Sequence, residues 1–299
     1  MSTFILLTIT GLGLGAMYFL IASGLSLIYG LMGVLNFAHG AFITVGAYTT
    51  WWTSTHVFDG VHSVLLRFLL SSLLGLLVGG VFAALVELIL IRPLYARHIE
   101  QVLVTVGLSL AFVALIQGIW GPDPKELVVP PWLHDTTTIG GAHVPNDRFV
   151  EIATAAVVLG LLQLFLRKTR YGLIIRAGVE NRAMVTALGI DVRKAFTLVF
   201  AVGGVAAAVA GVLSGVYFNV VGPTQGVSLL IFAFIVVVIG GLGSIGGSAM
   251  AAVLVGLTQQ YANYYASSGV GDMVVVLLLG LVLLTRPRGL AGAMTGARA

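Results

Sequence analysis

Residues 167–194 read RKTRYGLIIRAGVENRAMVTALGIDVRK, and this stretch sets the topology of the chain. It holds seven of the fifteen lysine and arginine residues, opposed only by Glu180 and Asp191. Long apolar runs stand on both sides of it, at 152–166 and 195–216. Basic loops between membrane spans stay in the cytoplasm. We therefore expect 167–194 to be a cytoplasmic loop.

The composition requires a lipid environment. The chain is 59% hydrophobic and only 9% charged, and its mean hydropathy is +1.07. A soluble domain of this length cannot bury so much apolar surface in one core. We expect an all-α, polytopic helical bundle that forms one membrane domain, 1–299. Cysteine is absent, which excludes disulfides and thiolate metal sites. We assign the net charge of +4 to membrane topology and not to nucleic-acid binding.

The apolar segments predict eight or nine membrane crossings. About 20 apolar residues are needed to span the hydrocarbon core as a helix. The predicted segments are 4–29, 30–52, 64–91, 102–120, 152–166, 195–216, 227–239, 249–265 and 273–285. Segments 30–52 and 227–239 are alternatively re-entrant. The polar, proline-rich loop 121–148 has no basic excess, so we place it outside. The basic tail then lies in the cytoplasm and the N-terminus outside.

Two glycine-interrupted segments are candidates for the transport pathway. Irregular backbone at membrane depth is tolerated only where protein or a watery cavity covers it. GLMGVLNFAHG (30–40) therefore suggests a broken helix near a pathway, and GGLGSIGGS (240–248) suggests a half-helix, a turn and a helix start capped by Ser244. The alternatives are close helix packing for the first and a tight cytoplasmic loop for the second. The candidate pathway residues are Asn36, Phe37, His39, Gly40, Gly240, Gly241, Gly243, Ser244 and Gly246.

Other glycines repeat at four-residue spacing, as in 203–215 and 11–15. This small-residue spacing is typical of helices packed closely in a membrane. We assign no ligand role to these glycines.

Ionisable groups are scarce in the predicted spans. Glu87 and Asp272 lie near span ends, and His39 is the other candidate. Ion-coupled carriers keep charged groups at membrane depth despite their cost, and ion channels use carbonyl filters or charged rings. The scarcity argues against both classes, and against a membrane enzyme built on paired acids. The sequence also lacks a phosphate-binding loop, so any ATP that drives transport must bind another subunit.

The basic loop predicts a short cytoplasmic helix over 173–188. Thr169 is placed to cap its start and Gly189 to end it. Such a helix suits the groove of a soluble partner, and the alternative is a helix that lies on anionic headgroups. The candidate residues for coupling this chain to such a partner are Arg176, Glu180, Arg182, Met184, Leu188 and Gly189.

Five pieces of the sequence together resemble a known transporter family. They are GLSLIYGLMGVLNFAHGAFITVGAY (24–48), ELILIRPLY (87–95), YGLIIRAGVENRAMVTALGIDVRK (171–194), IGGLGSIGGS (239–248) and LLTRPRGLAG (283–292). In this order they resemble the permease subunits of bacterial branched-chain amino-acid ABC importers of the LivH type. The pieces span nearly the whole chain.

The resemblance implies a multi-subunit importer in the bacterial inner membrane. A LivM-like second permease, two LivG/LivF-like ATPases that bind ATP and Mg, and a soluble substrate-binding protein would complete it. It places 180–189 in the ATPase-coupling loop, and 36–40 and 240–247 near the pathway. Members of the family often carry an acid where this chain has Ala41. Because relatives also move urea and short amides, the resemblance leaves the cargo open between these and branched-chain amino acids.

Overall fold

The structure is a computed structural model that describes residues 2–33, 35–95, 97–187, 189 and 191–291, without the side chains at 31, 178–183 and 186–187. It confirms the predicted all-α class. The longer helices are α1 (Ser2–Met32), α2 (His39–Trp52), α3 (Val64–Val86), α4 (His98–Trp120), α5 (Asn146–Lys168), α6 (Arg170–Ala187), α7 (Val192–Phe218), α8 (Gln225–Gly240), α9 (Ile245–Tyr265) and α10 (Val270–Thr285). The short elements are π-helices η1 (Thr53–Val57) and η2 (Glu87–Ile91), 3₁₀-helices η3 (Arg92–Leu94) and η4 (Pro131–Leu133), and strands β1 (Lys125–Glu126), β2 (Thr136–Ile139), β3 (Ala142–Pro145) and β4 (Val220–Val221).

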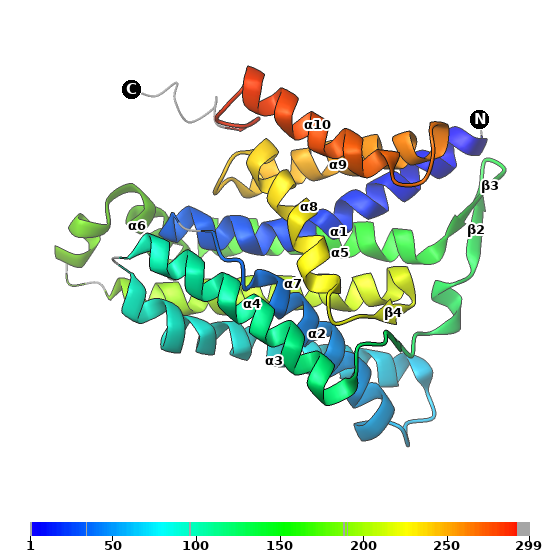
Figure 1. Ribbon diagram of the computed structural model, residues 1–299, viewed down its shortest axis with the longest axis horizontal. Helices are drawn as coiled ribbons and strands as arrows, with labels where there is room; N and C mark the ends of the chain where they lie inside the picture. The colour runs from blue at the N-terminus through cyan, green and yellow to red at the C-terminus, as the bar shows by residue number, and fades with distance from the viewer. Residues whose placement is uncertain (1, 34, 96, 188, 190, 292–299) are drawn as a thin grey trace.

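The helices form an elongated bundle with two distinct ends. Figure 1 shows the start of α1 and the β2–β3 hairpin at one end of the long axis and α6 at the other. We call these the hairpin end and the α6 end. α4 and α8 cross the face nearest the viewer, and α9 and α10 lie along the top of the bundle.

Small residues let the central helices approach closely, which confirms the packing role predicted for the glycine repeats. A Cβ added at Gly211 on α7 would lie 2.2 Å from the carbonyl oxygen of Ile43 on α2. One added at Gly15 on α1 would lie 2.6 Å from the carbonyl oxygen of Ala252 on α9. The core of the bundle therefore depends on backbone-to-backbone contact.

The described residues contain fewer long spans than the sequence predicts. Five helices, α1, α3–η3, α4, α5 and α7, are long and apolar enough to cross a membrane, or up to six spans if α8 and α9 count as one. α8 and α9 meet at a bend of 117°. The other predicted crossings correspond to α2, with 14 residues, and α10, with 16. The apolar pattern predicts a helix but does not fix where its α-helical part ends. α2, for example, gives way to the π-helix η1 after Trp52.

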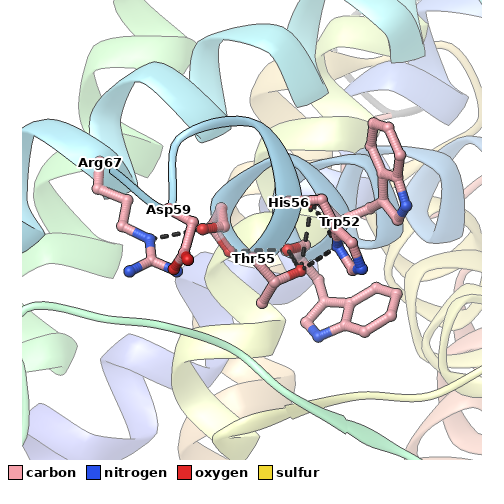
Figure 2. A network of polar contacts seen from close by, with 7 residues as sticks. Trp52, Thr55, His56, Asp59 and Arg67 are labelled. Atoms are coloured by element: carbon pink, nitrogen blue, oxygen red, sulfur yellow. Dashed lines mark hydrogen bonds and ion pairs between the residues drawn. The ribbon is translucent and has the colours of Figure 1, made fainter. Parts of the chain in front are cut away.

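The C-terminal end of α2 is fastened to the start of α3. Figure 2 shows His56 of η1 stacked on Trp52, with ring centroids 5.4 Å apart. The Arg67 guanidinium lies 3.0 Å from the Asp59 carboxylate, and its Nε donates to the Ser54 carbonyl oxygen at 2.5 Å. These contacts hold the aromatic end of α2 against the start of α3.

The predicted external loop contains short β-strands and ends earlier than expected. β2 and β3 form an antiparallel hairpin, and β1 pairs with β4, so that this loop is attached to the α7–α8 connection. α5 begins at Asn146, which corrects the predicted boundary at 148. Asp147 is buried and Arg148 is half-buried in the first turn of α5, where their side chains form an ion pair at 3.4 Å.

Candidate substrate groove and coupling region

The chain breaks between α1 and α2, as the broken-helix hypothesis predicts. α1 ends at Met32, and Gly33 follows with a φ of +67°, in the left-handed region. The Asn36 side-chain oxygen accepts a hydrogen bond from the Ala38 amide at 3.0 Å. This local turn lets α2 start at His39 instead of continuing α1.

Asn36 and Phe37, at this break, line an apolar groove of about 240 Å³. Its walls come from α1, α4 and α8, and the rings of Phe37 and Phe234 lie 6.5 Å apart. Ile231 of α8 and Leu110 of α4 are exposed on its rim, so the groove opens to the outside of the bundle. The Asn36 amide nitrogen is buried and has no hydrogen-bond partner among the described residues. The groove therefore offers one polar group in an apolar setting, as binding sites for small apolar ligands do.

His39 and Gly40 lie in helix packing and not in the groove. The His39 ring is fully buried, and its Nε2 lies 3.2 Å from the Ile21 carbonyl oxygen of α1. A Cβ at Gly40 would lie 3.0 Å from the carbonyl oxygen of Gly226 on α8. His39 and Gly40 thus pack between helices, whereas Asn36 and Phe37 line the groove, and the place of all four on a pathway stays a prediction.

The second glycine segment forms the bend between α8 and α9. Gly241 and Gly243 have φ angles of +100° and +81°, and Ser244 caps α9 by accepting from the Gly247 amide at 3.1 Å. A Cβ at Gly243 would lie 2.9 Å from Cα of Gly30 at the end of α1, and one at Gly240 would lie 2.5 Å from the Gly247 carbonyl carbon.

The bend is also anchored to the chain beyond α10. The Leu290 amide donates to the Ile239 carbonyl oxygen at 2.8 Å. Gly246 lies in the first turn of α9, and no atom lies within 4 Å of the position that a Cβ would take there. None of these bend residues lines the groove, although Gly243 packs against Gly30 of the first glycine segment.

A buried charge cluster joins α3 to α7 near the α6 end. Glu87 begins η2, and its side chain is 0% exposed. Arg92 donates to both Glu87 carboxylate oxygens at 3.2 Å, and Tyr95 donates to the same carboxylate. Thr197 of α7 donates to Glu87 Oε2 at 2.8 Å and accepts from Arg92 at 2.7 Å. Burial and the Glu87 carboxylate raise the pKa of the Tyr95 hydroxyl.

The predicted coupling helix is present as α6, close to its expected bounds. Thr169 caps it by accepting from the Gly172 amide at 3.0 Å, and Gly189 has a φ of +77°. Both features confirm the sequence prediction. Arg176 and Met184 are exposed, the latter at 62%, whereas Val185 is buried against the bundle. Leu188 lies outside the described residues, as do the side chains of Glu180 and Arg182.

Sequence reasoning missed two buried clusters. Thr197 carries no sequence signal that links it to Glu87, which lies 110 positions away. The second cluster centres on Arg148, which pairs with Glu151 at 3.2 Å and lies over the Tyr217 ring at 3.5 Å. The i,i+3 spacing of Arg148 and Glu151 was the available signal, and the predicted loop boundary hid it.

Comparison with known proteins places the chain among transporters. The profile of the family described as "Branched-chain amino acid transport system / permease component" matches residues 7–285. The chain is 31% identical over 292 residues to the high-affinity branched-chain amino acid transport system permease protein BraD of Pseudomonas aeruginosa, covering 95% of this chain and 94% of that protein. It is 28% identical to LivH of Escherichia coli K12, covering 94% and 93%.

A second kind of permease is also similar. LivM of Salmonella typhimurium is 26% identical over 297 residues, which cover 91% of this chain and 69% of that protein. No solved structure matches the chain. Because the family profile covers most of the sequence, the chain belongs to the permease-component family of branched-chain amino acid transport systems.

Proposed function

We propose that this chain is the membrane permease subunit of an ATP-driven importer of branched-chain amino acids such as leucine, isoleucine and valine. The observation that carries the proposal is similarity to BraD and LivH over nearly the whole chain. The apolar groove at Asn36 and Phe37 is consistent with this cargo, because moving an aliphatic side chain from water onto an apolar surface lowers the free energy. We place the groove on the route of the substrate.

The remaining subunits follow from the same proposal. A LivM-like permease would pair with this chain, and two LivG/LivF-like ATPases holding ATP and Mg would dock at the α6 end. A soluble binding protein would deliver substrate at the hairpin end, which we assign to the outside of the inner membrane. ATP binding would pull on α6 and α7, and the Glu87–Thr197 contact would carry that movement to α3. Switching a population from about 1:99 to 99:1 needs roughly 5.5 kcal/mol, which the ATPases would supply.

Reconstitution of the complex tests the proposal. The chain is co-expressed with its neighbouring permease and ATPase genes, placed in nanodiscs and assayed for ATP hydrolysis with and without binding protein and leucine. We expect hydrolysis to rise only when binding protein and leucine are both present, with glutamate as the control ligand. Stimulation by urea or a short amide, and not by leucine, would show that the substrate is one of these compounds and not a branched-chain amino acid. Failure of matched ATPase subunits to assemble would overturn the importer itself.

A further inference from the structure

A second and larger cavity, of about 580 Å³, lies near the hairpin end. α1, α7, α8, α9 and α10 all contribute to its walls, together with β4 and Pro124. Its lining combines aromatic rings, including Tyr18 and Phe232 stacked 5.1 Å apart, with polar side chains. This mixture differs from the groove at Asn36, whose lining is almost wholly apolar. We call this second cavity the vestibule.

One wall of the vestibule carries two hydrogen-bond acceptors, the Asp272 carboxylate and the Gln259 amide oxygen. Gln259 of α9 is only 5% exposed, and its amide nitrogen donates to Oδ1 of Asp272 on α10 at 2.6 Å. The Gln259 amide oxygen is buried and has no hydrogen-bond partner among the described residues. Buried polar groups normally have one, so this acceptor, whose polar neighbour is the Tyr18 hydroxyl, is available to a ligand. Among the described residues that line the vestibule there is no lysine, arginine or histidine to neutralise Asp272.

Another wall is formed by the beginning of α8. Thr224, Gln225 and Ser228 line the vestibule, and no side-chain hydrogen bond caps this helix start. The first amides of a helix lack partners within the helix and carry a partial positive charge. In membrane transporters such interrupted helix starts point at anionic groups of substrates. The vestibule thus has an acceptor wall with a carboxylate and a separate wall where the partial positive charge of the α8 start favours an anion. On that second wall the Gln225 amide already donates to the Gly222 carbonyl oxygen at 3.2 Å, and the Ser228 amide donates to the Thr224 carbonyl oxygen at 3.1 Å.

We propose that the vestibule binds the zwitterionic head of an α-amino acid before the molecule moves toward the groove. The Asp272 carboxylate and the Gln259 amide oxygen accept hydrogen bonds from the α-ammonium group, and the start of α8 receives the α-carboxylate. The apolar side chain lies against the rings of Tyr18 and Phe232. This inference rests on the proposed import of amino acids and assigns their charged groups to particular residues.

The absence of cysteine from the chain makes a direct test possible. Ser228→Cys places the single thiol of the chain in the vestibule, and Thr138→Cys on the exposed hairpin is the matched control. The full chain is expressed with its partner subunits in right-side-out membrane vesicles. Labelling by a cationic and by an anionic methanethiosulfonate reagent is followed by the mass of the purified chain. The assay needs neither ATP hydrolysis nor uptake, so its failure is distinct from failure of the proposed function.

The expected labelling rates distinguish an amino-acid binding site from a cavity that binds no amino acid. Leucine should slow the labelling of Ser228→Cys by both the cationic and the anionic reagent. Leucinamide and 4-methylpentanoate, which lack the carboxylate and the ammonium group respectively, should protect much less. Adding Asp272→Asn should slow the cationic reagent relative to the anionic one. It should also raise the half-protecting leucine concentration about tenfold, the lower end expected for a hydrogen bond to a charged group. Thr138→Cys should show none of these effects.

Three outcomes would overturn the inference. One is rapid labelling of Ser228→Cys that leucine, up to its solubility limit, does not slow. Another is equal protection by leucine and 4-methylpentanoate, which would show that the ammonium group is not recognised. The third is labelling only after the vesicles are permeabilised, since the vestibule would then not face the outside. Gln259→Met, which keeps the volume but removes the acceptor, provides a second variant and should weaken protection in the same direction.

Discussion

The charge cluster around Glu87 yields a prediction whose sign and size follow from the geometry. Arg92→Leu would leave the fully buried Glu87 carboxylate without a cation among the described side chains that contact it, and with hydrogen bonds from Thr197 and Tyr95. Breaking a buried ion pair by removing one partner costs about 3–5 kcal/mol, because the remaining charge is uncompensated. The Arg92 side chain is 31% exposed, so water can partly replace it, and we expect the lower end, about 3 kcal/mol.

The assay is the melting temperature of the detergent-purified complex for Arg92→Leu, Glu87→Gln and the double variant. Glu87→Gln removes the buried charge, and Arg92 can still reach water, so that variant should be only mildly destabilised. The double variant should therefore melt well above Arg92→Leu, since it carries no unpaired carboxylate. If the double variant and Arg92→Leu melt at the same temperature, the loss comes from packing and the electrostatic reasoning is refuted.

Three further predictions test packing, coupling and the groove. Gly226→Ala would place a Cβ 2.1 Å from the Gly40 carbonyl oxygen and should destabilise the complex by about 1–3 kcal/mol in thermal melts. Gly107→Ala, on α4 with open space around it, is the control, and equal losses for the two would contradict the close contact. Glu180→Arg should leave membrane insertion intact but reduce ATPase co-purification, and undiminished co-purification would remove Glu180 from the coupling surface. Phe37→Trp should fill the groove and lower leucine uptake several-fold without loss of assembly, whereas normal uptake would separate the groove from the pathway.

Local features of the fold were predictable because they depend on neighbours in sequence. Thr169 and Ser244 cap the helices that their positions predict, through hydrogen bonds to amides three residues ahead. The break at 33–38 follows from Gly33 and from the turn that Asn36 makes with Ala38. None of these interactions requires a partner from a distant part of the chain.

The candidate site was predictable only in part. Asn36 and Phe37 do border a groove, but its other walls come from α4 and α8, which no sequence pattern links to them. His39 looked like a pathway residue because it is polar at membrane depth, yet it packs against Ile21. On α6, Val185 faces the bundle whereas its neighbour Met184 is exposed, and no sequence pattern separates the two. Burial of a single side chain depends on which neighbour covers it, and that neighbour is set by tertiary contacts.

The sequence by itself determined that this protein lies in a lipid membrane, that it is helical, where its helices break and to which family it belongs. Those properties follow from hydropathy, glycine positions and motifs, all of which act locally or through composition. Only the tertiary structure decided which break borders a cavity, and it selected 36–37 and the start of α8 at Gln225 over the bend at 240–248. It also decided that Glu87 meets Thr197 and that Gln259 meets Asp272. The physical reason is that both features need several helices at once. A cavity forms where packed helices leave space between them, and a buried polar cluster forms where side chains from different helices satisfy one another's hydrogen bonds. No single segment specifies which helices will be its neighbours.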